Sequence, residues 1–281
     1  MNIVVTGYAS MDYALRLDSP AAPDRTATIL SRPREWPRIG GSPAYVASAL
    51  AAAGVRGATP VSWIGDDVQG VRYREELRLR GVETEGVRAR PGRTPICILA
   101  YQPDGGCLCL YDPGLDPPPA LDDGQRALIS AADLLCLTVG PAQATREALT
   151  LARPDAKVVW AVKADPRATP PDLASDLAAR ADFIVHSRGE AAFVAEAGPT
   201  RRDAVRIETR GPEGVAIFHD GEETLVPVEP IATDDSTGAG DAWLGGFLAA
   251  HCVRDETLIA SARSGSESVR ELFAARRPSR T

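Results

Sequence analysis

The sequence predicts an α/β protein in which a mostly parallel β-sheet is covered by helices on both faces and carries a small second β-sheet. The main observation is an alternation of continuous apolar strands and helices from residue 133 onward, in the order 134–139, 143–152, 157–162, 171–180, 183–185 and 189–197. Strands that are buried on both faces form unbroken apolar runs, and their alternation with helices is typical of a parallel sheet.

A second observation predicts the smaller sheet. The apolar runs 96–101 and 107–111 flank Pro103-Asp-Gly-Gly106, which is a strong hairpin signal. Residues 11–39 contain four prolines and an alternating stretch, which predicts an exposed hairpin rather than core. The segments at about 11–39 and 94–112 are therefore expected to form a small sheet beside the main one, while residues 1–281 form a single domain.

The remaining elements can be taken in chain order. Ile3 to Thr6 is a short apolar strand that ends at Gly7. The small apolar residues 42–53 predict a closely packed helix, which is followed by a strand at 60–64 and by a helix from Asp66 and Asp67 to about Arg80. Later in the chain, strands at 205–209, 215–219 and 224–228 predict an antiparallel edge, and helices are expected at 238–250 and about 255–275.

Composition excludes several classes of protein. The chain has 281 residues, a hydrophobic content of 44% and a formal net charge of -7. No long run of like charge is present, which argues against a dedicated nucleic-acid or membrane-surface binder. The five scattered cysteines and the absence of a signal-like N-terminus favour a cytoplasmic location.

The stretch from Asp235 to Asp241, with the sequence Asp-Ser-Thr-Gly-Ala-Gly-Asp, carries the clearest chemistry. It precedes an apolar run, 242–250, that predicts a helix. A glycine turn at the start of a helix directs backbone N–H groups outward and forms an anion site. A carboxylate beside such a site suits phosphoryl transfer to a hydroxyl group, in which the carboxylate accepts the proton. The sequence has neither a P-loop motif nor a third glycine that would complete a dinucleotide fingerprint.

Five motifs in the same order resemble the PfkB (ribokinase-like) family of sugar and nucleoside kinases. Asp235 to Asp241 is close to that family's D-T-T-G-A-G-D signature, and Gly40-Gly41 opens the small-residue helix as its N-terminal motif does. The stretches 7–12, 65–67 and 209–214 also align. The resemblance covers nearly the whole chain and implies a ribokinase-like three-layer α/β sandwich with a small β-sheet lid.

The resemblance also implies roles for individual residues. Asp241 would be the catalytic base, and Gly238, Ala239 and Gly240 would supply the backbone donors that hold the phosphoryl charge. Asp12 would bind substrate hydroxyl groups, and Gly40 and Gly41 would let the backbone approach the substrate. The nucleotide cleft would be lined by Thr209, Gly211 and Gly214. Glu190 matches a motif that is linked to Mg²⁺, usually through water, so ATP and Mg²⁺ are the expected cofactors.

Two positions depart from the family pattern. Tyr45 stands where an asparagine is usual, and three roles remain open for it: stacking on a ring substrate, filling the pocket, or packing. Ser187, which we expect among the nucleotide-binding residues, replaces the asparagine that usually precedes Glu190 by three residues. Lys163 and Arg167 follow an apolar strand at the edge where ligands gather in α/β sheets, so each is either a nucleotide-phosphate ligand or a solvated surface charge.

The expected activity is the ATP-dependent phosphorylation of a hydroxymethyl group of a sugar or related small molecule. A nucleoside kinase and a non-catalytic small-molecule binder with a kinase-like fold are the alternatives. Closure of the lid over the site would exclude water. The apolar alternation at 96–101 also suggests that the lid pairs with a second copy to form a homodimer.

Overall fold

The computed structural model shows two β-sheets and eight α-helices within the described residues, 1–116, 119–233 and 235–276. Residues 117, 118, 234 and 277–281 of the expected domain lie outside them. No helix within these stretches is long and apolar enough to span a membrane.

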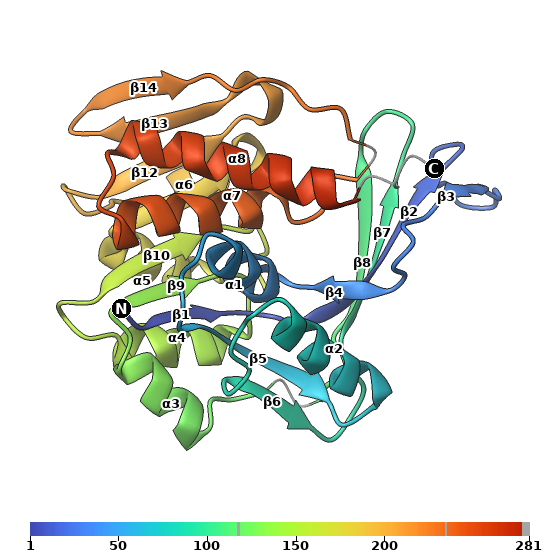
Figure 1. The fold of residues 1–281 in the computed structure, drawn as a ribbon, viewed down its shortest axis with the longest axis horizontal. Coiled ribbons are helices and arrows are strands. Elements are labelled where there is room, and N and C mark those ends of the chain that lie inside the picture. The colour runs from blue at the N-terminus through green and yellow to red at the C-terminus, as the bar shows by residue number, and fades with distance from the viewer. Residues whose placement is uncertain (117–118, 234, 277–281) are drawn as a thin grey trace.

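The larger sheet has nine strands in the spatial order β14-β13-β12-β11-β10-β9-β1-β5-β6 (Figure 1). Their bounds are β1 Ile3–Thr6, β5 Ala58–Gly65, β6 Val87–Arg90, β9 Leu134–Leu137, β10 Lys157–Ala161, β11 Phe183–Ser187, β12 Val205–Thr209, β13 Val215–His219 and β14 Glu222–Val226. The strands from β12 to β6 run parallel, while β13 and β14 form an antiparallel edge. The prediction of a mostly parallel sheet is thus confirmed.

Successive residues of a strand point to opposite sides of this sheet, so both faces carry apolar side chains and both are covered by helices. On β1, Ile3 and Val5 belong to one apolar core and Val4 belongs to the other. The first core packs against α1 Ser42–Ala52, α2 Val68–Leu79, α7 Ala239–Leu248 and α8 Leu258–Arg276. The second core packs against α3 Asp123–Ser130, α4 Ala142–Leu151, α5 Pro171–Arg180 and α6 Ala191–Glu196. Short helical turns, η1 Arg188–Glu190, η2 Gly211–Glu213 and the π-helical η3 Ala249–Val253, complete the chain.

The smaller sheet, called the lid below, projects from one end of the larger sheet (Figure 1). It contains β2 Ser10–Leu17, β3 Ile29–Ser31, β4 Arg38–Gly40, β7 Ile96–Tyr101 and β8 Cys107–Asp112. β2 pairs in parallel with β7 and antiparallel with β3 and β4. The lid therefore joins two distant segments of the chain.

Some element predictions were wrong. The segment 11–39 is not a wholly exposed hairpin, because Met11 and Ala14 of β2 are at most 1% exposed and, of its three strands, only β3 is fully exposed. The prolines mark its loops rather than its central strand. β12 pairs in parallel with β11 as well as antiparallel with β13, so it is not purely an edge strand. β6 and α3 were not predicted from the sequence.

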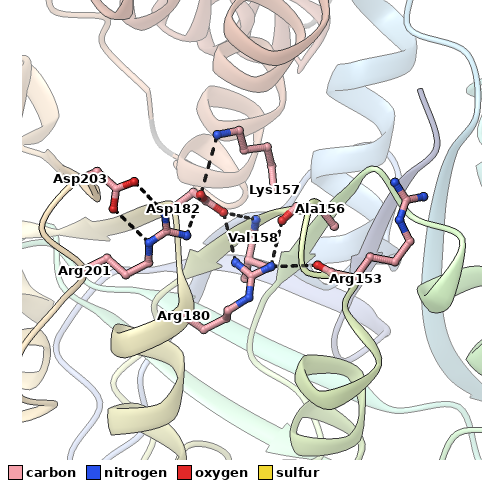
Figure 2. A network of polar contacts seen from close by, with 8 residues as sticks. All are labelled: Arg153, Ala156, Lys157, Val158, Arg180, Asp182, Arg201 and Asp203. Atoms are coloured by element: carbon pink, nitrogen blue, oxygen red, sulfur yellow. Dashed lines mark hydrogen bonds and ion pairs between the residues drawn. The ribbon is translucent and has the colours of Figure 1, made fainter.

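A polar network connects the amino-terminal ends of β10 and β11 (Figure 2). The Asp182 carboxylate, 12% exposed, accepts a hydrogen bond of 2.8 Å from the Val158 backbone and one of 3.0 Å from Arg201. Arg180 donates to the Arg153 and Ala156 carbonyls at 3.1 Å and 2.9 Å. These contacts satisfy backbone groups where strands and loops meet.

Candidate active site

The glycine turn lies at the amino-terminal end of α7, where the helix meets the lid (Figure 1). Gly238 is the N-cap residue and has a φ of 73°, a left-handed conformation that side chains disfavour. A Cβ atom at this position would lie 2.7 Å from the Tyr45 ring. Only a glycine at position 238 therefore allows this turn to pack against α1. The first N–H groups of α7 lack partners within the helix and can face an anion.

The backbone N–H donors of this turn are not equivalent. The N–H of Ala239 donates to the Ser236 carbonyl at 3.0 Å, so it would have to leave that partner to meet a phosphoryl group. Gly240 is exposed, and beyond its chain neighbours and the backbone of its own helix no described atom lies within 4 Å of where its Cβ would be. The backbone around Gly240 is therefore the most open part of the turn.

Asp241 stands in the first turn of α7 and is partly buried. Burial raises the pKa of its carboxyl to about 6, and the charges of Asp12 and Glu190 add to this effect. A hydrogen bond from Ser42 and the charge of Lys163 act in the opposite direction. A carboxyl with this pKa is a better proton acceptor near neutral pH than an ordinary aspartate, and it still ionises.

Asp12 is carried by β2 of the lid and is 3% exposed. Its carboxylate accepts hydrogen bonds of 2.6 Å from Ser10 and 3.4 Å from Tyr45, and burial raises its pKa. Gly40 lies directly against it, since a Cβ there would come within 2.0 Å of a carboxylate oxygen. Gly41, with a φ of 84°, then starts α1 against the Tyr8 carbonyl. The two glycines allow the backbone to pass next to Asp12.

Tyr45 is 4% exposed and lies between Asp12 and the glycine turn. Its ring supports Gly238 and its hydroxyl donates to Asp12, so of its three possible roles packing agrees best with this position. The ring has almost no accessible face on which a substrate could stack.

A cavity of about 320 Å³ lies beside the turn. Thr209, Gly211 and Gly214 line one side of it, and Ala239 and Gly240 line another. The remaining walls are mainly apolar and include Val228, Ile231, Trp243, Val269 and Phe273. The structure thus brings three of the predicted nucleotide residues, Thr209, Gly211 and Gly214, together with the glycine turn.

Sequence reasoning did not identify the apolar residues that α8 contributes to this cavity. Val269 and Phe273 are four residues apart and therefore lie on the same face of the helix. This spacing was the available signal, but the serines at 261–268 gave the segment a polar character. Trp243 stacks on Phe247, with 5.2 Å between the ring centres, and also lines the cavity.

The residues predicted to meet phosphate or metal are divided between buried and exposed positions. Glu190 is 9% exposed, and one of its oxygens accepts hydrogen bonds of 2.8 Å and 2.7 Å from the backbone and hydroxyl of Ser187. Its other oxygen is 3.6 Å from the Lys163 ammonium group. The Arg167 side chain is 97% exposed and lies 3.9 Å from Asp165, so it resembles a solvated surface charge more than a ligand.

A pair of arginines beside the turn was also missed. Arg38 on β4 is 5% exposed and lies 2.6 Å from Asp235, while Arg276 at the end of α8 approaches Asp235 from another side. Burial alone would raise the pKa of Asp235, but the hydrogen bond and charge of Arg38 outweigh it and hold the pKa at about 2. The first aspartate of the signature is therefore an ionised partner of arginines.

Comparison with known proteins identifies the class to which this fold and site belong. The model of the pfkB family of carbohydrate kinases matches residues 1–269, so the chain belongs to this family of phosphotransferases. The expected kinase class is thereby confirmed.

Individual relatives agree with that class. An ATP-dependent ribose-1-phosphate kinase from Halopiger xanaduensis is 29% identical and aligns over 89% of this chain and 84% of its own. A cytidine kinase from Thermococcus kodakarensis is 33% identical over 36% of this chain and 40% of its own. The nucleoside kinase of Methanocaldococcus jannaschii superposes with a TM-score of 0.78 at 18% identity, covering 98% of this chain and 92% of its own, which confirms the ribokinase-like fold.

Proposed function

We propose that this protein transfers the γ-phosphoryl group of ATP to a hydroxymethyl group of a sugar, with Asp241 as the general base. The observation that carries the proposal is the position of Asp241 in the first turn of α7, with a pKa of about 6, next to a turn whose open side faces the cavity. Proton acceptance and charge stabilisation are the two requirements of such a transfer, and they meet at this turn.

The cavity is the proposed ATP site. Apolar walls from α8 and the 228–231 segment suit a nucleotide base, while Gly211 and Gly214 allow close backbone approach. A triphosphate that extends from this cavity towards Gly240 would place its terminal group at the positive end of α7. The backbone donors around Gly238 and Gly240 would hold it there.

Mg²⁺ belongs to the proposal as a companion of the ATP phosphates. Within the described stretches, no cluster of three His, Cys, Asp or Glu side chains could hold a metal by itself. Mg²⁺ commonly uses one or two carboxylates together with substrate phosphates and retained waters, and Glu190 fits such a role through water. The metal would neutralise phosphate charge, while Lys163 beside Glu190 would supply a further cation.

The acceptor is proposed to bind at the lid, near Asp12. A buried carboxylate flanked by Gly40 can accept hydrogen bonds from sugar hydroxyl groups. A pentose phosphate is our first choice, because the relative that aligns along most of both chains is a ribose-1-phosphate kinase. Arg38 provides a buried cation close to Asp12 that suits an anionic sugar.

A nucleoside acceptor is the second candidate, supported by the partial alignment with a cytidine kinase. The burial of Tyr45 counts against it, since that ring offers no stacking platform. A non-catalytic binder with this fold is a third possibility, but a pure binder has no need of the intact Gly-Ala-Gly-Asp turn.

Release of ADP from ATP and Mg²⁺ tests these candidates, with ribose, ribose 1-phosphate, cytidine and inositol as acceptors. We expect turnover with a pentose or its phosphate, and a loss of roughly 10²- to 10⁴-fold in Asp241→Asn because the general base is removed. Asp220→Asn, which changes an aspartate whose side chain is 78% exposed, is the matched control and should be unaffected. Normal turnover in Asp241→Asn would reject this residue as the base, and no ADP release with any acceptor would favour the binder.

We also propose a cytoplasmic location, which would provide ATP and keep the cysteines reduced. A homodimer formed through the lid would cover apolar side chains on its outer face.

A further inference from the structure

Arg276 reaches from the end of α8 to the back of the catalytic turn. Its guanidinium donates to the Thr237 carbonyl at 2.7 Å and to the Asp235 carbonyl at 3.4 Å. The same group lies 3.8 Å from the Asp235 carboxylate and 5.8 Å from the centre of the Tyr45 ring. Its side chain is only 20% exposed. Two carbonyls, one carboxylate and one aromatic face therefore surround a single cation.

These contacts bear directly on the orientation of the turn. The peptide unit is planar, and its C=O and N–H groups point in opposite directions. A cation that holds the Thr237 carbonyl therefore fixes the direction of the Gly238 N–H, which belongs to the same peptide unit. Gly238 itself has no side chain that would restrict its backbone at a φ of 73°, so the orientation of this peptide unit depends on contacts from neighbouring elements.

The surroundings show that the turn is held from several elements. Arg38 of β4 binds Asp235 at 2.6 Å, and the Tyr101 hydroxyl of β7 lies 2.6 Å from the Thr237 hydroxyl. Arg276 engages the backbone carbonyls themselves: it binds that of Thr237, and it shares that of Asp235 with the Thr233 hydroxyl, which donates at 3.0 Å. Carbonyl and carboxylate oxygens are also the ligands that hard metal cations choose, so the turn presents a cation site that the chain fills with its own side chain.

We propose that Arg276 is a positioning residue that serves as a tethered cation for the catalytic turn, so that turnover requires no free monovalent cation. The inference rests on the proposed function of the turn. Arg276 acts on the reaction through the backbone donors, and it does not touch the substrate. Its loss should therefore lower kcat more than it changes KM.

The first test compares Arg276→Ala with Arg263→Ala, which removes an exposed arginine from the same helix. We expect kcat to fall about 10- to 100-fold in Arg276→Ala, the order of effect of a misplaced donor, with both KM values within about threefold. Arg276→Lys should keep more activity, and added guanidinium or K⁺ should restore part of the Arg276→Ala rate. An Arg276→Ala variant that matches the wild type would overturn the proposal.

The second test needs no variant. The wild-type rate should be the same in choline, Na⁺ and K⁺ salts at equal ionic strength, whereas strong activation by K⁺ would overturn the proposal. This comparison decides the question even if Arg276→Ala fails to fold.

The third test does not depend on turnover. Hydrogen exchange of the amides at 235–241 should become faster in Arg276→Ala and stay unchanged in Arg263→Ala, and equal exchange in both variants would contradict the proposal. A wild type that shows no ADP release with any acceptor would instead refute the proposed function, and the exchange experiment would still report on the turn.

Discussion

Asp241 combines two properties that oppose each other. As the proposed base it must ionise, but its partly buried position favours the neutral form and raises its pKa from 3.8 to about 6. The folded state therefore retains a proton over a pH range in which the unfolded chain has lost it. The ionised carboxylate that the proposed reaction needs is therefore maintained at a cost in stability.

The pH dependence of turnover follows from the same pKa. We expect kcat/KM to be constant above about pH 7 and to fall below about pH 6, approaching tenfold per pH unit, because only the ionised base can accept the proton. A pH–rate profile of the wild type with its best acceptor measures this. A profile that stays flat down to pH 5 would show that Asp241 does not titrate in the active enzyme.

The stability of the fold should depend on pH in the opposite direction to turnover. Asp241 binds more protons in the folded state between about pH 4 and pH 6, so its contribution to the free energy of unfolding decreases as pH rises through this range. The shift from 3.8 to about 6 corresponds to about 3 kcal/mol at most above pH 6. Asp241→Asn removes this cost and should unfold at a higher temperature than the wild type at pH 8, with a smaller difference at pH 4. Thermal unfolding at both pH values tests it, and equal unfolding temperatures at pH 8 would contradict it.

At the scale of elements, the glycine turn depends on its fit against α1. Gly238→Ala introduces a methyl group 2.7 Å from the Tyr45 ring, in addition to the strain of a positive φ. Gly221→Ala is the matched control, because Gly221 has a φ of 82° with open space around it. Strain alone should cost about 1 kcal/mol in either variant, so Gly238→Ala should be the less stable and should lose turnover. Urea unfolding and ADP release measure both effects, and identical behaviour of the two variants would argue against the packing role of Tyr45.

The polar network at the amino-terminal ends of β10 and β11 is expected to act on stability alone (Figure 2). Asp182→Ala leaves the Val158 N–H and the nearby arginines without their carboxylate, and it should cost about 2 kcal/mol, or roughly 4–8 °C in Tm. Asp203→Ala removes an exposed carboxylate that pairs with Arg201 and should change Tm little. Turnover at 25 °C should be normal in both variants. A Tm for Asp182→Ala equal to that of Asp203→Ala would show that the network is not stabilising.

Sequence patterns predicted those elements whose signal is local. The apolar runs of β9 to β11 and the glycine turn before α7 needed no knowledge of their neighbours. The burial of β2 was missed because it depends on parallel pairing with β7, a contact between residues far apart in the chain. The same reason explains why Arg38 and Arg276 were missed, since each binds Asp235 from a different element. On α8, the spacing of Val269 and Phe273 indicates an apolar face of the helix, but the serines that precede them give this segment a polar character.

At the scale of the whole molecule, the register of β7 and β8 shows which side chains of the lid lie on each of its two faces. Tyr101 contacts the glycine turn through Thr237, so the side chains that share its face point towards the candidate site. Those of the opposite face point outward and include Ile98, Leu108 and Leu110, of which Leu108 and Leu110 are 40% and 52% exposed. An apolar outer face on a projecting sheet is a suitable surface for a second copy of the chain.

Leu110→Asp tests this dimer, because it places a charge in the middle of the outer face of the lid. Leu225→Asp is the matched control, since Leu225 is also 52% exposed and also lies on a strand, but at the far edge of the larger sheet. We expect light scattering to show a dimer for the wild type and Leu225→Asp at micromolar concentration and a monomer for Leu110→Asp. Because Leu110 points away from the catalytic turn, the monomer should retain nucleotide binding, and any loss of turnover would measure how far pairing supports lid closure. A wild type that is monomeric at every concentration would rule out the lid dimer.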